Sequence, residues 1–155
     1  MEIISIYETR RFMETNTAYH ALLKNLGLKA TPKRLALLSV LEGERRYLSP
    51  EEVWKKLKRG FKSLGLPTVY RNMEELERHG VISQVLHSNR QLYYYFCPRG
   101  GHHHHFVCME CRMVEDLSVC ALRGMEKEIK RRIKGTVTSH ILQVNGLCGG
   151  CAGKQ

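Results

Sequence analysis

The chain has 155 residues, a net charge of +10 at neutral pH and 43% hydrophobic residues. This length allows one ordinary domain or two small ones, and the charge favours an anionic partner, most simply nucleic acid. No stretch approaches the roughly 18 apolar residues that a membrane span needs, and the first residues are too polar for a secretory signal. We therefore expect a cytoplasmic protein that does not act at a membrane.

Helix signals follow one another through the first half of the chain. Residues 1–16 show no clean periodicity, and we interpret them as an N-terminal extension. Residues 17–27 predict a short helix that ends at a glycine. Three further helices begin at capping or proline-led starts, namely Thr31-Pro32, the capping box Ser49-Pro50-Glu51-Glu52, and Leu66-Pro67-Thr68.

A hairpin follows the fourth predicted helix. Residues 81–86 and 91–96 are rich in β-branched and aromatic residues and flank a turn at residues 87–90. Helices followed by a two-stranded ribbon are typical of a winged helix-turn-helix, which we place at residues 1–97.

A second, mixed domain is predicted after a Pro-Arg-Gly-Gly hinge at residues 98–101. It covers residues 102–155. Two short strands, an amphipathic helix and a β-rich run are predicted within it at 106–108, 113–116, 119–134 and 136–144. The fold class is therefore α+β, with an N-terminal winged helix and a small C-terminal α/β domain.

The fourth predicted helix has the composition of a DNA-recognition helix. One side is apolar, and the other offers polar and basic groups to the major groove. Arg71 suits a bidentate contact with guanine and Asn72 one with adenine. The other candidate DNA contacts are Thr68, Tyr70, Lys29, Lys33 and Arg34, of which the last three would hold phosphates. A solvated helix face with incidental charge is the alternative for any single residue.

Two Cys-x-x-Cys pairs predict a metal site in the second domain. The four residues are Cys108, Cys111, Cys148 and Cys151. Thiolates in this arrangement typically bind zinc in a closed, structural site. The alternative is two unrelated redox pairs. Cys120 is left over; it falls in the predicted helix, where packing is its expected role.

Four consecutive histidines precede the first cysteine pair and predict further metal binding. On an extended strand, His103 and His105 share one face, while His102 and His104 share the other. A regulatory site would combine His103 and His105 with two residues of the first domain, His87 and Cys97. This sulfur-and-nitrogen set suits zinc, and the ion would bridge the two domains.

Two additions to this histidine chemistry are also possible. Asp116 could replace one regulatory ligand or hydrogen-bond to a ligating histidine. A third site would combine His102, His104 and His140, with Glu115 or Glu126 nearby.

Four segments resemble the ferric uptake regulator superfamily of metal-responsive repressors: residues 27–34, 67–72, 103–111 and 148–151. The resemblance implies a dimer with an N-terminal winged helix and a C-terminal α/β dimerisation domain. It also implies that most such proteins bind DNA when loaded with metal. Lys29, Tyr70 and Arg71 match the expected DNA contacts, and both cysteine pairs match the structural zinc site.

Within the superfamily, the resemblance is greatest to the zinc uptake regulators. Iron- and peroxide-sensing members usually have a histidine where this chain has Tyr47, and a carboxylate where it has Cys97. Zinc uptake regulators pair a cysteine with two histidines at the spacing seen here. Some use an acidic fourth ligand near the place of Ser83, which leaves His87 as the candidate.

These observations predict a DNA-binding repressor rather than an enzyme. We expect a homodimer on palindromic double-stranded DNA, with Zn2+ as structural ion and as co-repressor, and no small organic substrate. The alternative is an iron-responsive or peroxide-sensing regulator with Fe2+ or Mn2+ bound by His103, His105 and Asp116. A zinc hydrolase or deaminase lacks its sequence signatures here, and a metal-storage protein is a further remote alternative.

Overall fold

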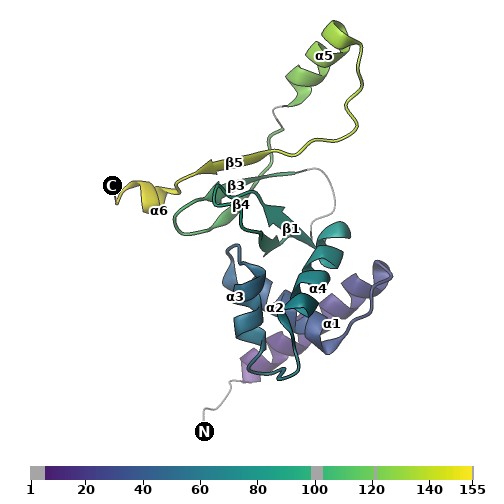
Figure 1. Ribbon diagram of the computed structural model, residues 1–155, viewed down its shortest axis with the longest axis vertical. Coiled ribbons are helices and arrows are strands. Elements are labelled where there is room, and N and C mark those ends of the chain that lie inside the picture. The colour runs from purple at the N-terminus through teal and green to yellow at the C-terminus, as the bar shows by residue number, and fades with distance from the viewer. Residues whose placement is uncertain (1–5, 99–102, 121, 155) are drawn as a thin grey trace. The chain divides into compact units, whose positions relative to one another are not determined.

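The computed structural model describes residues 6–98, 103–120 and 122–154, without the side chains of residues 6–15 and of Arg123 (Figure 1). The chain divides into two compact units, an N-terminal unit of residues 1–98 and a C-terminal unit of residues 99–155. None of the described helices combines the length and apolar content needed to cross a bilayer.

The N-terminal unit is a winged helix. Its described elements are α1 (Ile6–Asn25), α2 (Pro32–Glu44), α3 (Pro50–Leu57), α4 (Leu66–Arg78), β1 (Ile82–Val85) and β2 (Tyr93–Phe96). β1 and β2 are antiparallel, with Ile82 opposite Phe96. Tyr94 also exchanges two backbone hydrogen bonds with Leu48, of 2.8 and 2.9 Å, which attach the ribbon to the segment before α3. The predicted order of helices and hairpin is confirmed.

The helix starts follow the predicted capping chemistry. The Thr31 hydroxyl accepts a hydrogen bond from the backbone N–H of Arg34 at the start of α2. At α3, the backbone N–H of Ser49 donates to the Glu52 carboxylate at 2.8 Å, and the backbone N–H of Glu52 donates to the Ser49 hydroxyl at 3.3 Å. These side chains satisfy donors that a helix start otherwise leaves unpaired.

The first helix is longer than predicted. α1 begins at Ile6 rather than at Thr17, so most of the predicted N-terminal extension is helical. Residues 6–16 are mainly polar and charged, so they lack the apolar periodicity by which a helix is recognised in a sequence. The C-terminal half of α1 does carry buried residues, Tyr19 and Leu23, which pack into the core.

The core of the N-terminal unit joins its helices and the ribbon. Leu38 and Leu41 from α2, Met73 from α4 and Ile82 from β1 are at most 1% exposed. Large apolar side chains therefore fill one continuous cluster, which holds α4 by its apolar side.

The C-terminal unit is built on a three-stranded mixed sheet in the order β4-β3-β5. Its described elements are β3 (His104–Cys108), β4 (Val114–Leu117), α5 (Leu122–Ile133), β5 (Gln143–Gly146) and α6 (Gly149–Ala152). β3 pairs antiparallel with β4 and parallel with β5. The α+β class is confirmed.

Two predicted elements of this unit are shorter than expected. The helix predicted from residue 119 begins at Leu122, so Cys120 precedes it. The β-rich run 136–144 becomes strand only from Gln143. Gln143 lies opposite His105, the second residue of β3, so little of β3 remains for earlier residues of the run to pair with.

Candidate metal centres and DNA-binding surface

The four predicted cysteines come together at one end of the sheet. Cys108 ends β3, Cys111 lies in the turn to β4, and Cys148 and Cys151 flank the start of the short helix α6. The turn is fixed by hydrogen bonds from the backbone N–H of Cys108 to Met113 O (2.9 Å) and from that of Arg112 to Cys108 O (3.1 Å). The backbone N–H of Cys151 donates to Cys148 O at 2.9 Å, which closes the second pair into a similar turn.

The spacing of the sulfurs fits a tetrahedral ion. All four Sγ atoms lie within 4.8 Å of one another. The Sγ atoms of Cys111 and Cys148 are 3.7 Å apart. Bonds of about 2.3 Å to a tetrahedral zinc ion place sulfurs about 3.8 Å apart, so the four-cysteine cluster has the size of such a site.

Hydrogen bonding around the four thiols shifts their pKa values in opposite directions. Backbone hydrogen bonding, chiefly from the N–H of Cys148 at 3.3 Å, lowers the pKa of the Cys108 thiol to about 6. Hydrogen bonding to Cys148 raises the pKa of the Cys151 thiol to about 12. Without a cation, the sulfurs share their protons unevenly; a divalent ion would bind all four as thiolates and release those protons.

A second cluster lies on one face of the sheet at the start of β3. One nitrogen of His103, one of His105 and one carboxylate oxygen of Asp116 lie within 4.8 Å of one another. The two imidazole rings are 4.6 Å apart between centroids, and Asp116 Oδ1 is 3.5 Å from His105 Nε2. Asp116 is the cross-strand partner of His105, so the β3–β4 register produces this contact. Burial, followed by the charge of His103, lowers the pKa of His105 and favours the neutral, ligating imidazole.

His87 and Cys97 lie at opposite ends of the β1–β2 ribbon in the N-terminal unit. The Cys97 backbone N–H donates to Val81 O at the open end. The His87 ring lies beyond the other end, next to Tyr47 and Tyr93. At about 3.4 Å per residue, the ribbon between them is roughly 10 Å long or more. The structure therefore does not bring His87 and Cys97 together, and this separation argues against His87 as the fourth ligand.

A third cluster occupies the opposite face of β3. His104 is only 2% exposed, and its Nε2 lies 3.4 Å from Nε2 of His140. The Cys120 Sγ lies 3.6 Å from the same His140 nitrogen. Zinc bonds of about 2.0 Å to nitrogen and 2.3 Å to sulfur place two nitrogens about 3.3 Å apart and a nitrogen and a sulfur about 3.5 Å apart in a tetrahedral site. His102 lies outside the described residues.

Sequence reasoning missed Cys120 as a member of this third cluster. The predicted helix 119–134 included this cysteine, and a helical position suggested simple packing. In the structure Cys120 precedes α5 and is half-buried beside His140. The count of cysteines could have indicated this role. After the two pairs and Cys97 are assigned, one of the six cysteines remains, and it lies in a domain rich in metal ligands.

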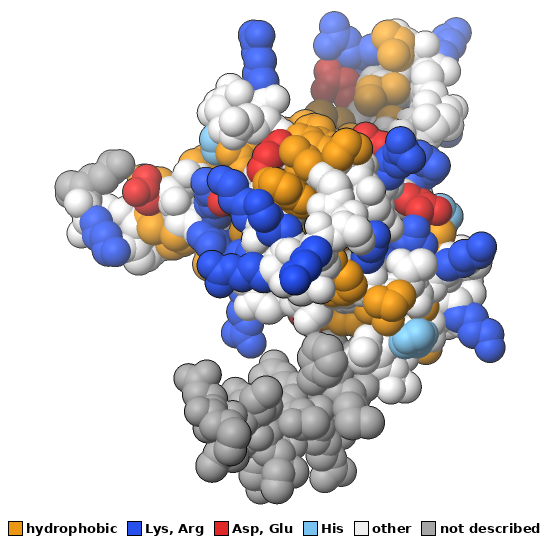
Figure 2. Space-filling view, turned by 60° about the horizontal axis from the view of Figure 1, so that its bottom comes forward, with side chains coloured by type: hydrophobic (Ala, Val, Ile, Leu, Met, Phe, Trp, Pro, Cys, Tyr) orange, Lys and Arg blue, Asp and Glu red, His pale blue; other side chains and the backbone are white. Residues whose placement is uncertain are grey.

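The predicted DNA-contacting residues fall into two groups. Lys29 and Arg71 are exposed, whereas Lys33, Thr68 and Tyr70 are half-buried. The Tyr70 hydroxyl donates a hydrogen bond to the carboxylate of Glu51 on α3, which raises the pKa of Tyr70 to about 12. The contact fixes the direction of the Tyr70 side chain on α4. Many Lys and Arg side chains, and fewer Asp and Glu, appear on the face shown in Figure 2.

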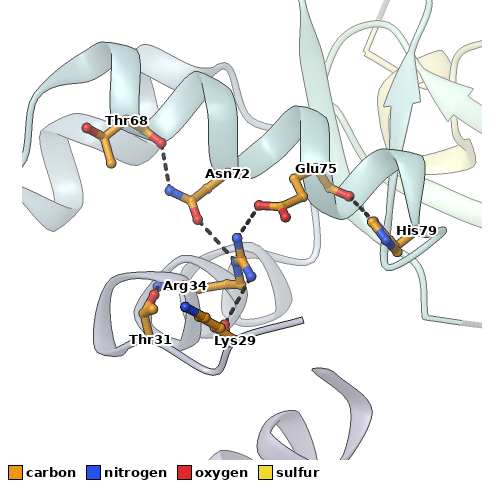
Figure 3. A network of polar contacts seen from close by, with 7 residues as sticks. All are labelled: Lys29, Thr31, Arg34, Thr68, Asn72, Glu75 and His79. Atoms are coloured by element: carbon orange, nitrogen blue, oxygen red, sulfur yellow. Dashed lines mark hydrogen bonds and ion pairs between the residues drawn. The ribbon is translucent and has the colours of Figure 1, made fainter. Parts of the chain in front are cut away.

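Arg34 and Asn72 form the second group and take part in an internal network (Figure 3). Arg34 is 7% exposed and donates to Asn72 Oδ1 at 3.1 Å, to Lys29 O at 3.0 Å and to the carboxylate of Glu75. The Asn72 amide in turn donates to Thr68 O at 2.7 Å. The network ties α2 and the Lys29 backbone to α4, so these two side chains are engaged within the protein rather than directed to bases or phosphates.

Comparison with known proteins places this arrangement in a family. Residues 25–145 match the model of the Ferric uptake regulator family. The Ferric uptake regulation protein of Bacillus subtilis (strain 168) is 35% identical over 130 residues, which cover 82% of this chain and 87% of that protein. The chain belongs to the ferric uptake regulator family.

Solved structures of the family share this fold. The ferric uptake regulator of Vibrio cholerae is 31% identical, with a TM-score of 0.59, over 84% of this chain and 99% of that chain. A zinc uptake regulator complexed with zinc and DNA has a TM-score of 0.75, over 92% of this chain and 96% of that one. At 18% identity, the second likeness concerns the fold alone.

Membership of the ferric uptake regulator family defines the general activity. The chain is a metal-responsive, DNA-binding transcription regulator and not an enzyme. Regulators of this family bind DNA as dimers and bind metal ions. The chain has a winged helix and a four-cysteine cluster that could bind a metal ion.

Proposed function

We propose that this ferric uptake regulator family member is a zinc-responsive repressor in which zinc acts as co-repressor. The observation that carries the proposal is the cluster of His103, His105 and Asp116, with a buried cysteine, Cys97, six positions upstream of His103. Six residues of extended chain span at most about 20 Å, so Cys97 is tethered close enough to be the fourth ligand.

The chemistry of this set favours zinc. Thiolate and imidazole groups suit borderline-soft zinc, while an oxygen-rich set would suit iron or manganese better. Tyr47 occupies the position at which iron-sensing members usually have a histidine. Its side chain is fully buried and packs edge-on against Tyr93 at 5.0 Å, so it belongs to the core of the N-terminal unit.

An iron-responsive or peroxide-sensing regulator is the second candidate. Two observations favour it: the curated relative described above is named for ferric uptake, and Asp116 contributes a carboxylate oxygen to the cluster. In this case His103, His105 and Asp116 would hold Fe2+ or Mn2+, without Cys97. The two candidates therefore differ in whether the Cys97 sulfur binds the regulatory metal.

We propose that the metal controls DNA affinity through the hinge. In this proposal residues 1–97 bind DNA, residues 98–101 form the hinge and residues 102–155 form the dimerisation domain of a cytoplasmic homodimer. A ligand from each side of the hinge would restrain it. Two recognition helices must reach major grooves roughly 34 Å apart on a palindromic operator, so this restraint would decide affinity. A shift from 1:99 to 99:1 in favour of the binding form needs about 5.5 kcal/mol.

Two further metal assignments belong to the proposal. The four-cysteine cluster would hold a structural zinc ion, because its donors are all thiolates and its spacing is tetrahedral. The cluster of His104, Cys120 and His140 would hold a third ion, with Cys120 added to the residues expected from the sequence.

The decisive experiment is operator binding against buffered free zinc, with Cys97→Ser and His87→Gln as a matched pair. We expect Cys97→Ser to shift the half-maximal zinc concentration at least tenfold, while His87→Gln behaves like the wild type. X-ray fluorescence at the zinc and iron edges identifies the bound metals in the same samples. A zinc response that survives in Cys97→Ser, together with iron in the His103 cluster, would establish the second candidate instead.

A further inference from the structure

The corner between α1 and α2 encloses an open hollow of about 640 Å³ in the N-terminal unit. Thr17, His20 and Lys24 line it from α1, and Lys29 lines it from the loop that follows. His20, Lys24 and Lys29 are all exposed. Lys29 is a candidate DNA contact, whereas no role has yet been assigned to the α1 side chains of this hollow.

Local backbone geometry explains why these side chains share one hollow. Thr17, His20 and Lys24 are spaced three and four residues apart, so they form one stripe along α1. Gly27 then adopts a φ of +70°, and its N–H donates to Lys24 O at 3.0 Å. This left-handed glycine turns the chain back at the end of the helix, which brings Lys29 to the same side as the stripe.

The charged side chains that line the hollow are all basic. None of the described residues that line it is acidic. Tyr19, the neighbour of His20, is buried in the core and donates its hydroxyl hydrogen bond to Glu42, a carboxylate of α2. Glu42 is not among the residues that line the hollow, whereas two lysines, Lys24 and Lys29, are. Such a site attracts an anion with several acceptor oxygens.

We propose that this hollow binds a phosphate of the DNA backbone, so that the DNA-contacting surface extends from Lys29 onto α1. The inference rests on the proposed function, because it assumes that Lys29 faces the duplex. A phosphate beside Lys29 would lie within reach of Lys24, with His20 and the Thr17 hydroxyl as further hydrogen-bonding groups. Contacts of this kind position a protein on DNA and carry no sequence information.

The salt dependence of binding tests the proposal. A duplex selected from random sequence by the metal-loaded protein serves as operator, and an unrelated duplex serves as non-specific DNA. Each neutralised phosphate contributes about 0.9 to the slope of log affinity against log salt. We expect Lys24→Met to reduce the slope by about 0.9 on both duplexes. The ratio of wild-type to variant affinity would then shrink about 3.5-fold between 50 and 200 mM salt.

Two matched variants support this measurement. Lys127→Met removes an exposed lysine of the same charge from α5 in the C-terminal unit and should leave the slope unchanged. Lys29→Met should reduce the slope as Lys24→Met does. Circular dichroism and thermal unfolding confirm that each variant is folded, since Lys24 is exposed.

The outcomes separate this inference from the proposed function. The inference is overturned if the salt slope of Lys24→Met equals that of the wild type. A loss of operator preference at this unchanged slope would indicate that Lys24 has a structural role. A wild-type protein that does not prefer its selected duplex when loaded with zinc overturns the proposed function. The slope on non-specific DNA still decides the role of the hollow in that case.

Discussion

The two units of this protein are stabilised in different ways. The largest fully buried side chains, such as Leu23, Leu38 and Met73, all belong to the N-terminal unit. In the described part of the C-terminal unit, the buried hydrophobic residues are Val107, Cys108 and Leu122. A unit of that size buries too little apolar surface to be stable alone, and metals or a second copy commonly compensate. We therefore expect the N-terminal unit to depend on its core, and the C-terminal unit to depend on bound metal and on a second copy of the chain.

The largest expected effect is the loss of one cysteine from the four-cysteine cluster. In Cys148→Ser we expect the C-terminal unit to lose its amide protection and the protein to become monomeric, because structural zinc contributes on the order of 10 kcal/mol in small metal-dependent domains. Hydrogen exchange measured by mass spectrometry, with sedimentation and metal analysis, reports each effect. Lys127→Met, at an exposed position outside the metal clusters of this unit, is the control. If Cys148→Ser keeps a protected, dimeric C-terminal unit, the comparison between the units fails.

A core substitution in the N-terminal unit should destabilise that unit and leave the C-terminal unit unchanged. Leu38 is completely buried, and Leu38→Ala should lower the free energy of unfolding of the N-terminal unit by about 2–5 kcal/mol. Metal content and dimerisation should remain unchanged. Leu86→Ala, at a position that is 57% exposed in the same unit, should have little effect. Unit-resolved hydrogen exchange measures both variants, and metal loss in Leu38→Ala would show that the units are coupled.

A third variant tests whether a second copy completes the C-terminal unit. The apolar face predicted for α5 is uncovered in the single chain, with Ile133 73% and Met125 51% exposed. If the partner buries this face, Ile133→Glu loses about 1.5–3 kcal/mol and weakens the dimer roughly 10- to 100-fold. Lys127→Glu on the same helix is the control. Equal dimer dissociation constants, measured by sedimentation, would place the dimer interface elsewhere.

The smallest effect concerns the polar network of the N-terminal unit. Arg34→Met keeps the buried stem but removes the hydrogen bonds to Asn72 and Lys29 O and the ion pair with Glu75, which should cost about 1–2 kcal/mol of stability. We expect weaker operator binding with an unchanged salt slope, because Arg34 orients α4 and does not neutralise a phosphate. Lys33→Met, which removes a proposed phosphate contact, should lower the slope by about 0.9. The same reduction in Arg34→Met would restore Arg34 as a phosphate contact.

The sequence was sufficient where local chemistry determines structure. Thr31 and the Ser49–Glu52 box mark helix starts because their side chains satisfy nearby backbone donors, whatever surrounds them. The two Cys-x-x-Cys pairs predicted their cluster because each turn presents two sulfurs to one ion. The alternation of His103, His104 and His105 was readable because strand side chains alternate in direction.

The sequence was insufficient where distant elements determine a role. Arg34 and Asn72 have the side chains of DNA-binding residues, and only the packing of α2 against α4 engages them with each other. Cys120 joins His140 across a gap of twenty residues, which no local period encodes. The first turns of α1 lack an apolar stripe, so their helical state was invisible to a periodicity argument.

The central strand β3 carries candidate metal ligands on both of its faces. His105 faces the cluster that also contains His103. His104 faces the opposite cluster, and Cys108, the last residue of β3, belongs to the four-cysteine cluster. Deleting or inserting a single residue between His105 and Cys108 would turn each histidine toward the wrong face relative to the cysteine knuckle. This short segment should therefore tolerate exchanges of its apolar side chains far better than any change in its length.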